Sequence, residues 1–128
     1  MKYEDLYLQM KELDDVTVRA PLKCAELGSG RYRVEAIPFP FESLNYGDEF
    51  EGEMKGDVLH VVRVVRRSGW TTNLFIMDYH DKKRSWLPKV EAKVDELGGL
   101  RDWFCGLLAI SLPPGVEYDP LPDMRTDE

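Results

Sequence analysis

Near the N-terminus, apolar residues recur every three or four positions. The residues that set this spacing are Tyr3, Leu6, Tyr7, Met10 and Leu13. Side chains at such intervals share one face of an α-helix. We therefore predict a short amphipathic helix over residues 3–13.

From residue 16 the chain changes to short segments of strand character, in which apolar and polar residues alternate or β-branched residues cluster. These segments are 16–18, 22–27, 31–37, 49–53, 58–67 and 71–79. Turn signals separate several of them, at Gly28-Ser29-Gly30, Lys55-Gly56-Asp57 and Ser68-Gly69. The doublets Val61-Val62 and Val64-Val65 indicate either a strand buried on both faces or bulges at a barrel bend.

The second half contains one helical pattern. Ser85 can cap a helix that ends at Gly98-Gly99. The residues on its apolar face are Leu87, Val90, Val94 and Leu97. An apolar strand over 106–112 follows, so that segment 71–79, the helix and this strand could form a βαβ crossover.

Together these elements predict an α+β fold. It consists of a small curved antiparallel sheet or barrel followed by a strand–helix–strand unit, with the short N-terminal helix in front. We expect a single domain over residues 1–118 and an acidic, irregular tail over 119–128.

The chain has a formal charge of −7, and the excess of acidic residues lies in residues 1–15 and 117–128. Phosphate binding depends on clustered Lys and Arg, so nucleic acid is not an expected partner. No apolar run reaches the roughly 20 residues that cross a bilayer, and the N-terminus lacks the apolar stretch of a signal peptide. We therefore expect a cytoplasmic protein without a membrane partner, with Cys24 and Cys105 as reduced, buried thiols.

Several short motifs are similar to those of a bacterial family of small proteins of unknown function. They are Ile37-Pro38-Phe39, Tyr46-Gly47-Asp48, Arg63-Val64-Val65-Arg66-Arg67-Ser68-Gly69 and Pro113-Pro114-Gly115. Trp70 stands where this family usually has histidine, and the acidic tail stands where the family continues into another helix. Because the family has no settled activity, the resemblance bears on the fold and leaves the function open.

The sequence contains no catalytic motif of known spacing, and we predict no catalytic residue, no metal and no cofactor. His60 lies in the valine-rich segment, where a histidine is usually a sheet residue. His80 lies between Asp78 and Asp81, but a strand places at most two of these side chains on one face, whereas zinc normally takes three or four ligands. Both cysteines have apolar neighbours, which disfavour a thiolate nucleophile.

A row of acidic residues is the most distinctive surface feature. In a strand, Glu49, Glu51 and Glu53 point to one side, where a basic partner would relieve their repulsion. A solvated edge strand protected by charge would have the same sequence. Trp70 could be an exposed aromatic anchor or fold over the core. The candidate partner-binding residues are Asn45, Tyr46, Asp48, Glu49, Glu51, Glu53 and Trp70.

Three functions are compatible with these features. The preferred hypothesis is a non-catalytic protein-binding protein, most concretely a toxin-immunity protein that occludes the active site of a cognate, basic toxin. The second is a regulatory module whose barrel binds a small ligand or peptide, in a pocket lined by Tyr32, Phe39, Phe41 and Tyr46. The third is an enzyme with an unrecognised site, in which a histidine or cysteine lies beside a carboxylate. The oligomeric state stays open.

Overall fold

The computed structural model describes residues 2–12, 15–76, 86–104 and 106–124. The chain divides into two compact units, Met1–Trp70 and Thr71–Glu128. We describe each unit by itself, and the expectation of a single domain over residues 1–118 stays a prediction.

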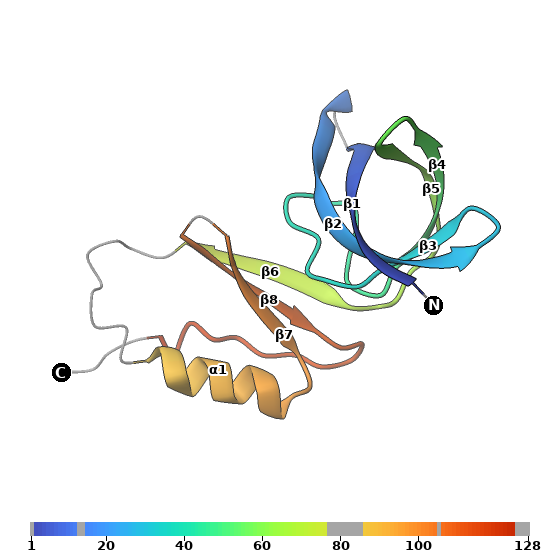
Figure 1. Cartoon of the computed structure of the whole chain (residues 1–128). Coiled ribbons are helices and arrows are strands. Elements are labelled where there is room, and N and C mark those ends of the chain that lie inside the picture. The colour runs from blue at the N-terminus through green and yellow to red at the C-terminus, as the bar shows by residue number, and fades with distance from the viewer. Residues whose placement is uncertain (1, 13–14, 77–85, 105, 125–128) are drawn as a thin grey trace. The chain divides into compact units, whose positions relative to one another are not determined.

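The first unit is a closed five-stranded barrel (Figure 1). Its strands are β1 (Lys2–Lys11), β2 (Thr17–Gly28), β3 (Arg31–Val34), β4 (Glu49–Lys55) and β5 (Val58–Arg66). Neighbours in sequence pair antiparallel, and the barrel closes where β1 pairs parallel with β5. The predicted turn at residues 28–30 joins β2 to β3, with positive φ angles at all three residues. The barrel option of the predicted fold is thus confirmed.

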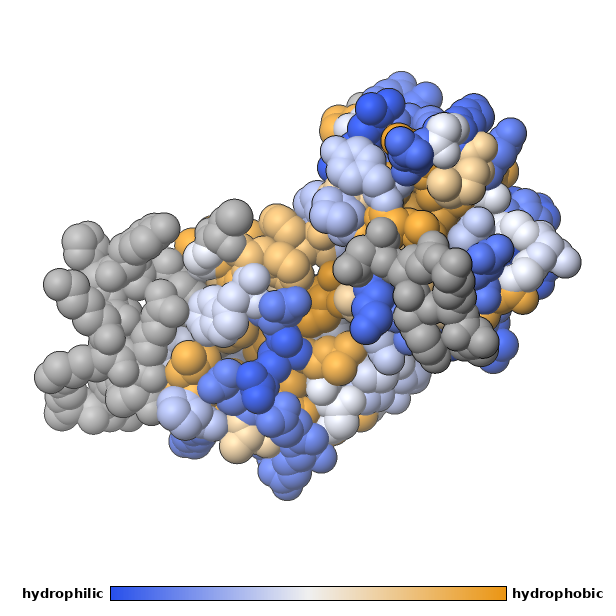
Figure 2. Space-filling model, in the orientation of Figure 1, coloured by the Kyte–Doolittle hydropathy of each residue, from blue (hydrophilic) through white to orange (hydrophobic). Residues whose placement is uncertain are grey.

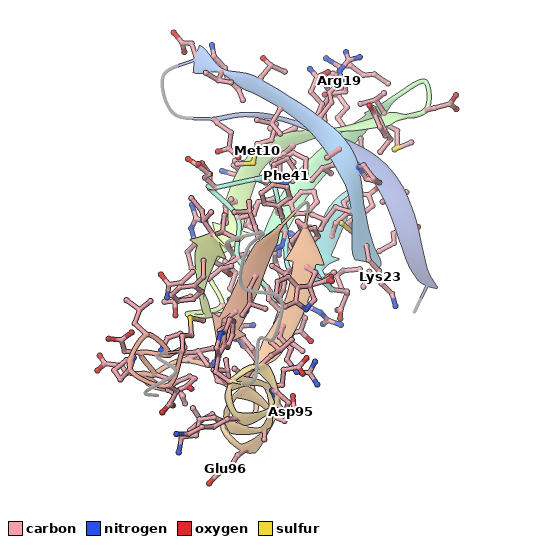
Figure 3. All side chains as sticks on the ribbon, turned by 90° about the vertical axis from the view of Figure 1, so that its left-hand side faces the viewer. Met10, Arg19, Lys23, Phe41, Asp95 and Glu96 are labelled. Atoms are coloured by element: carbon pink, nitrogen blue, oxygen red, sulfur yellow. The ribbon has the colours of Figure 1, made fainter. Side chains whose placement is uncertain are left out.

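Side chains fill the interior of the barrel. The buried core consists of Leu8, Leu22, Cys24, Tyr32, Val34, Phe41, Leu44, Phe50 and Leu59. Within this core the rings of Tyr32 and Phe50 stack with their centroids 5.6 Å apart. Phe41 lies among the strands, whereas Arg19 and Lys23 project outward from β2 (Figure 3). Strand alternation therefore separates an apolar interior from a charged exterior.

The predicted N-terminal helix over residues 3–13 is wrong, because residues 3–11 belong to strand β1; Leu13 lies outside the described residues. A second periodicity is present in the same residues: Leu6, Leu8 and Met10 alternate with polar positions and face the core. A helix of this length is marginal on its own. Strand β1 pairs along its whole length with β2 and also closes the barrel.

Both valine doublets in β5 are β-bulges, one of the two alternatives left open by the sequence. β5 has nine residues and its partner β4 has seven. The register shifts twice, so that Val62 and Val65 have no directly opposed residue in β4. A bulge inserts one extra residue and bends the strand, which is what closure of a small barrel requires.

The second unit is a three-stranded sheet in the order β6-β8-β7, with one helix packed on it (Figure 1). Its elements are β6 (Thr71–Ile76), α1 (Leu87–Glu96), β7 (Leu100–Phe104) and β8 (Leu107–Leu112). The buried residues between helix and sheet are Trp86, Val90, Val94, Leu108, Ile110 and Leu112. The helix and the flanking strands were predicted, whereas β7 was missed.

The predicted βαβ crossover is wrong, because β6 and β8 pair antiparallel. The reason is strand β7, which follows the helix and reverses the chain into β8 through a tight hairpin. A parallel pair needs a single crossover connection, and the additional strand removes it. Arg101 of β7 also binds the helix, with Nη1 2.6 Å from Glu91 Oε2 and Nη2 3.2 Å from Asp95 Oδ2.

The start of the predicted tail packs on the second unit. Residues 121–124 form turns, and Pro120 is buried. Tyr118 Oη donates a hydrogen bond to Asp123 Oδ2 over 2.8 Å, and Lys89 Nζ lies 3.2 Å from Asp123 Oδ1. Burial, followed by the bond to Asp123, raises the pKa of Tyr118. Residues 125–128 lie outside the described chain.

On the face seen in Figure 2, hydrophilic residues cover much of the barrel unit, with apolar residues between them. No helix in the described part of the chain is long and apolar enough to span a membrane.

A glycine in β4 provides a test of the barrel core. A Cβ at Gly52 would lie 2.7 Å from Leu59 Cδ1 and 3.2 Å from Tyr32 Cδ2. Because both neighbours are buried, Gly52→Ala should lower the free energy of unfolding by about 1–3 kcal/mol, measured by urea denaturation. The exposed variant Glu53→Ala in the same strand should change it by less than about 0.5 kcal/mol. Equal stability of the two variants would show that the core has room beside Gly52.

Candidate functional site

A buried carboxylate organises the loop between β3 and β4. The side chain of Asp48 is 1% exposed. Its Oδ2 accepts hydrogen bonds from the backbone N–H of Asn45 at 2.9 Å and from Arg67 Nη1 at 3.1 Å, and its Oδ1 accepts one from the backbone N–H of Ser68 at 2.8 Å. A buried charge is tolerated when its acceptor positions are used in this way. Asp48 therefore joins the β3–β4 loop to the segment that follows β5.

A second set of contacts draws the same two segments together. Ser68 Oγ donates to the carbonyl of Tyr46 over 2.5 Å and accepts from the backbone N–H of Trp70 at 3.2 Å. Gly47 has φ of +83°, and a Cβ there would lie 3.0 Å from Ser68 Cβ. Glycine is thus needed for both the backbone angle and the close approach. The Tyr46-Gly47-Asp48 and Ser68-Gly69 motifs meet at one place.

We call the β3–β4 loop and the segment that follows β5 the double loop. Tyr46 and Trp70 form an aromatic pair on it. Their ring centroids lie 4.6 Å apart with an interplanar angle of 66°, an edge-to-face arrangement. Both side chains are half-buried. We call Tyr46 and Trp70, together with the loops that carry them, the aromatic corner.

The acidic row is opposed by a basic row on the neighbouring strand. In the pairing of β4 with β5, Glu49 lies opposite Arg66, Glu51 opposite Arg63 and Glu53 opposite His60. The pairs of this charge ladder that make ionic contact are Glu51–Arg63, with two N–O distances of 3.0 Å, and Glu49–Arg66, at 3.8 Å. From the other side, β3 places Arg31 beside Glu51 and Arg33 beside Glu49.

The bulges make this ladder possible. The acidic residues of β4 occur every second position, which keeps them on one face, but the basic residues of β5 occur every third position. In a regular strand, Arg63 and Arg66 would point to opposite faces. The extra residues Val62 and Val65 correct the register, so that both arginines face outward.

The pairing of Glu49 and Glu51 with arginines removes the reason for which the sequence favoured a basic partner. The expectation of a basic partner rested on carboxylates that repel one another. Cross-strand pairs of opposite charge are stabilising by themselves. The hydrogen bond from Arg63 holds the pKa of Glu51 below its ordinary value of 4.5. Glu49 and Glu51 of the acidic row therefore already have counter-charges within the barrel.

The structure brings some of the seven candidate residues together and separates others. Asn45, Asp48 and the aromatic pair lie at the double loop, with Asp48 too buried to contact a partner. The three glutamates belong to the ladder along β4. The sequence-based analysis missed the roles of Arg63, Arg66, Arg67 and Ser68. The signal for the ladder was the interval of three between His60, Arg63 and Arg66, interrupted by valine doublets.

The other chemical candidates are placed as follows. His60 Nδ1 lies 3.3 Å from Gln9 Nε2 on the outside of the barrel, and Cys24 is buried in the core. Asp78, His80, Asp81 and Cys105 lie outside the described residues. Among the residues that the structure describes, no group of three His, Cys, Asp or Glu side chains could hold a metal ion.

The aromatic residues of the ligand-pocket hypothesis are divided between core and surface. Tyr32 and Phe41 belong to the buried core, and Tyr46 lies at the aromatic corner. Phe39 is half-buried. The small-ligand hypothesis stays a prediction.

The carboxylate of Asp48 should be required for the stability of the double loop. An amide has one acceptor oxygen, so Asp48→Asn would leave an N–H of Asn45 or Ser68 facing an NH₂ group. We expect the free energy of unfolding to fall by about 2–3 kcal/mol in urea denaturation, with a shift of the tryptophan emission. Glu26→Gln, on the exposed side of β2, is the control. If the two variants are equally stable, the carboxylate is not needed.

The charge ladder makes a prediction about pH. A carboxylate whose pKa is lower in the folded than in the unfolded state stabilises the fold above its unfolded pKa, and this stabilisation is lost as pH falls through the folded pKa. In Arg63→Gln, NMR titration should move the midpoint of the Glu51 carboxyl group to higher pH than in the wild type. Lys23→Gln should leave the midpoint unchanged. A midpoint that is the same in all three proteins would contradict the pairing.

Comparison with known proteins supports the fold. Residues 21–126 match the family DUF4265, described as a domain of unknown function. A solved structure, described as a novel crystal structure of a hypothetical protein from Neisseria gonorrhoeae, matches with a TM-score of 0.65 and 20% identity, covering 90% of this chain and 80% of that one. At this identity the match shows the fold alone. No curated protein matches the chain. The resemblance to a family of unknown function is confirmed, and the chain belongs to the DUF4265 family.

Proposed function

We propose that this chain is a non-catalytic protein-binding protein whose contact surface centres on the aromatic corner. The observation that carries the proposal is the edge-to-face pair of Tyr46 and Trp70, held on two loops by the buried carboxylate of Asp48. Tyrosine and tryptophan dominate the binding energy of protein interfaces. This pair is therefore a suitable anchor.

Preorganisation strengthens the proposal. Ordering a flexible loop on binding costs free energy that reduces the affinity. Here Asp48 and Ser68 hold both segments before any partner arrives, and Glu12 accepts a hydrogen bond from the backbone N–H of Ser43 at 3.1 Å within the β3–β4 loop. Arg67 lies beside them with an exposed side chain, and arginine is the third residue enriched in interface hot spots.

A toxin-immunity protein is the most concrete form of the proposal. Such a protein occludes the active site of its toxin, and an aromatic pair held in place before binding is suited to contact with the rim or floor of a concave site. Immunity would place the protein in the cytoplasm, where it would meet its toxin. The expectation of a basic toxin rested on the acidic row, in which Glu49 and Glu51 are paired with arginines. The proposal therefore does not require a basic partner.

The experiment begins with tagged protein produced in its own bacterium, from which a bound partner is captured and identified. The purified partner is then titrated calorimetrically with the wild type, Trp70→Ala and Tyr46→Ala. Removal of a central aromatic anchor costs at least about 2 kcal/mol, so each variant should bind at least about 30-fold more weakly. For immunity, co-production of the wild type should also restore growth of cells that make the partner.

Tyr7→Ala is the matched control, since Tyr7 is an exposed aromatic residue elsewhere on the barrel. It should change the affinity less than threefold. The proposal fails if the double variant Tyr46→Ala/Trp70→Ala remains folded and binds the partner as tightly as the wild type does.

A further inference from the structure

The outer surface of the charge ladder presents arginines rather than carboxylates. In the pair Arg63–Glu51 the side chains are 67% and 34% exposed, and in Arg66–Glu49 they are 77% and 21% exposed. Arg67 is 59% exposed above the buried Asp48. In each pair the positive group lies nearer the solvent.

The order varies among the ion pairs of the described chain. In Lys11–Asp15 and Lys93–Glu96 the acidic side chain is the more exposed one, whereas Lys89–Asp123 in the second unit has the same order as the ladder. Arg31, also exposed, extends the series on β3, where it flanks Glu51 from the side opposite to Arg63. We call Arg31, Arg63, Arg66 and Arg67 the arginine face.

The arginine face retains hydrogen-bonding capacity. A guanidinium group has five N–H donors. In the described contacts, Arg63 uses Nε and Nη2 to bind Glu51, and Arg67 uses Nη1 to bind Asp48 and the carbonyl of Ser43. The other N–H groups of these guanidinium groups carry positive charge and can donate hydrogen bonds to an anion. Their acidic partners also hold the guanidinium groups in place, which lowers the cost of ordering them on binding.

The spacing of the arginines defines the ligand. Because the bulges place Arg63 and Arg66 opposite Glu51 and Glu49, the two arginines follow the two-residue repeat of β4, roughly 7 Å along the strand. Carboxylates at alternate positions of an extended peptide have the same repeat. We propose that the arginine face binds an extended acidic segment of the protein partner, with carboxylates at every second residue. This inference rests on the proposed binding function and adds the chemistry of the partner.

A polypeptide fits this surface better than a nucleic acid. Each arginine of the ladder shares its charge with a glutamate, and the whole chain carries a charge of −7. Binding of a phosphate backbone depends on an excess of basic charge and on long-range attraction. A short acidic segment requires only local contacts with a few guanidinium groups.

The test uses three fluorescein-labelled probes: a blocked octapeptide of alternating glutamate and threonine, the same peptide with glutamine for glutamate, and an oligothymidylate of eight nucleotides. Binding is followed by fluorescence anisotropy at low salt and again at about 0.5 M salt, where screening is strong. We expect the acidic peptide alone to bind, with affinity lost at high salt. Arg63→Gln/Arg66→Gln should weaken its binding at least about tenfold.

Two further variants separate charge from folding. Lys23→Gln/Lys55→Gln removes the same charge from exposed sites elsewhere on the barrel and should bind like the wild type. Arg63→Lys/Arg66→Lys keeps the charge without the forked geometry and should recover part of the affinity. Circular dichroism and thermal unfolding show whether each variant is folded.

The outcomes distinguish the possible ligands. Tighter binding of the oligothymidylate than of the peptide, with the same dependence on the arginines, would assign the face to nucleic acid and overturn the proposal. It is also overturned if no probe binds, or if the lysine control weakens the peptide as much as the arginine variant does. Trp70→Ala should leave peptide binding intact. Loss of the captured partner on Trp70→Ala therefore tests the proposed function separately.

Discussion

Strand β5 must pair nine residues with the seven of β4, and the two bulges that result set the arrangement of the barrel. The bulges bend the strand so that the sheet can close. They also return Val61 and Val64 to the core side while Arg63 and Arg66 face the solvent. Packing inside and charge pairing outside thus depend on the same two extra residues.

The end of β5 leads directly into the second constraint, the buried carboxylate of Asp48. A charge withdrawn from water must find donors, and the donors here come from two segments that are distant in sequence. Satisfying one carboxylate therefore fixes two loops, and the aromatic pair is carried on them. The hydrogen bonds of Asp48 therefore stabilise this end of the barrel and also hold its two surface loops in place.

The two units use charge in different ways. In the barrel, cross-strand pairs form a ladder whose outer layer is basic. In the second unit, Arg101 joins β7 to α1, and Asp123 joins the end of the described chain to Lys89 of the helix. Asp95 and Glu96 project from α1 near its end, so the acidic character of the chain is visible there (Figure 3). A net charge of −7 therefore says little about the sign of any one surface.

The sequence by itself determined the elements whose pattern is local: most strands, the turns at glycines and helix α1. For the valine doublets it left two alternatives open, and the pairing of β5 with β4 selects the bulges. The local pattern gave the wrong element where the spacing of apolar residues fits both a helix and a strand, as it does in residues 3–13. Only the pairing of β1 with β2 and β5 decides between the two. The local pattern also failed for β7, a short strand that it did not predict.

The candidate site divides in the same way. Residue types identified Tyr46, Asp48 and Trp70 as candidate binding residues, but burial of Asp48 and pairing of Glu51 with Arg63 could not be read from the chain. Both depend on contacts between residues far apart in sequence, which form only when the barrel closes. Tertiary structure alone therefore decided which charges are neutralised and which ones face the solvent.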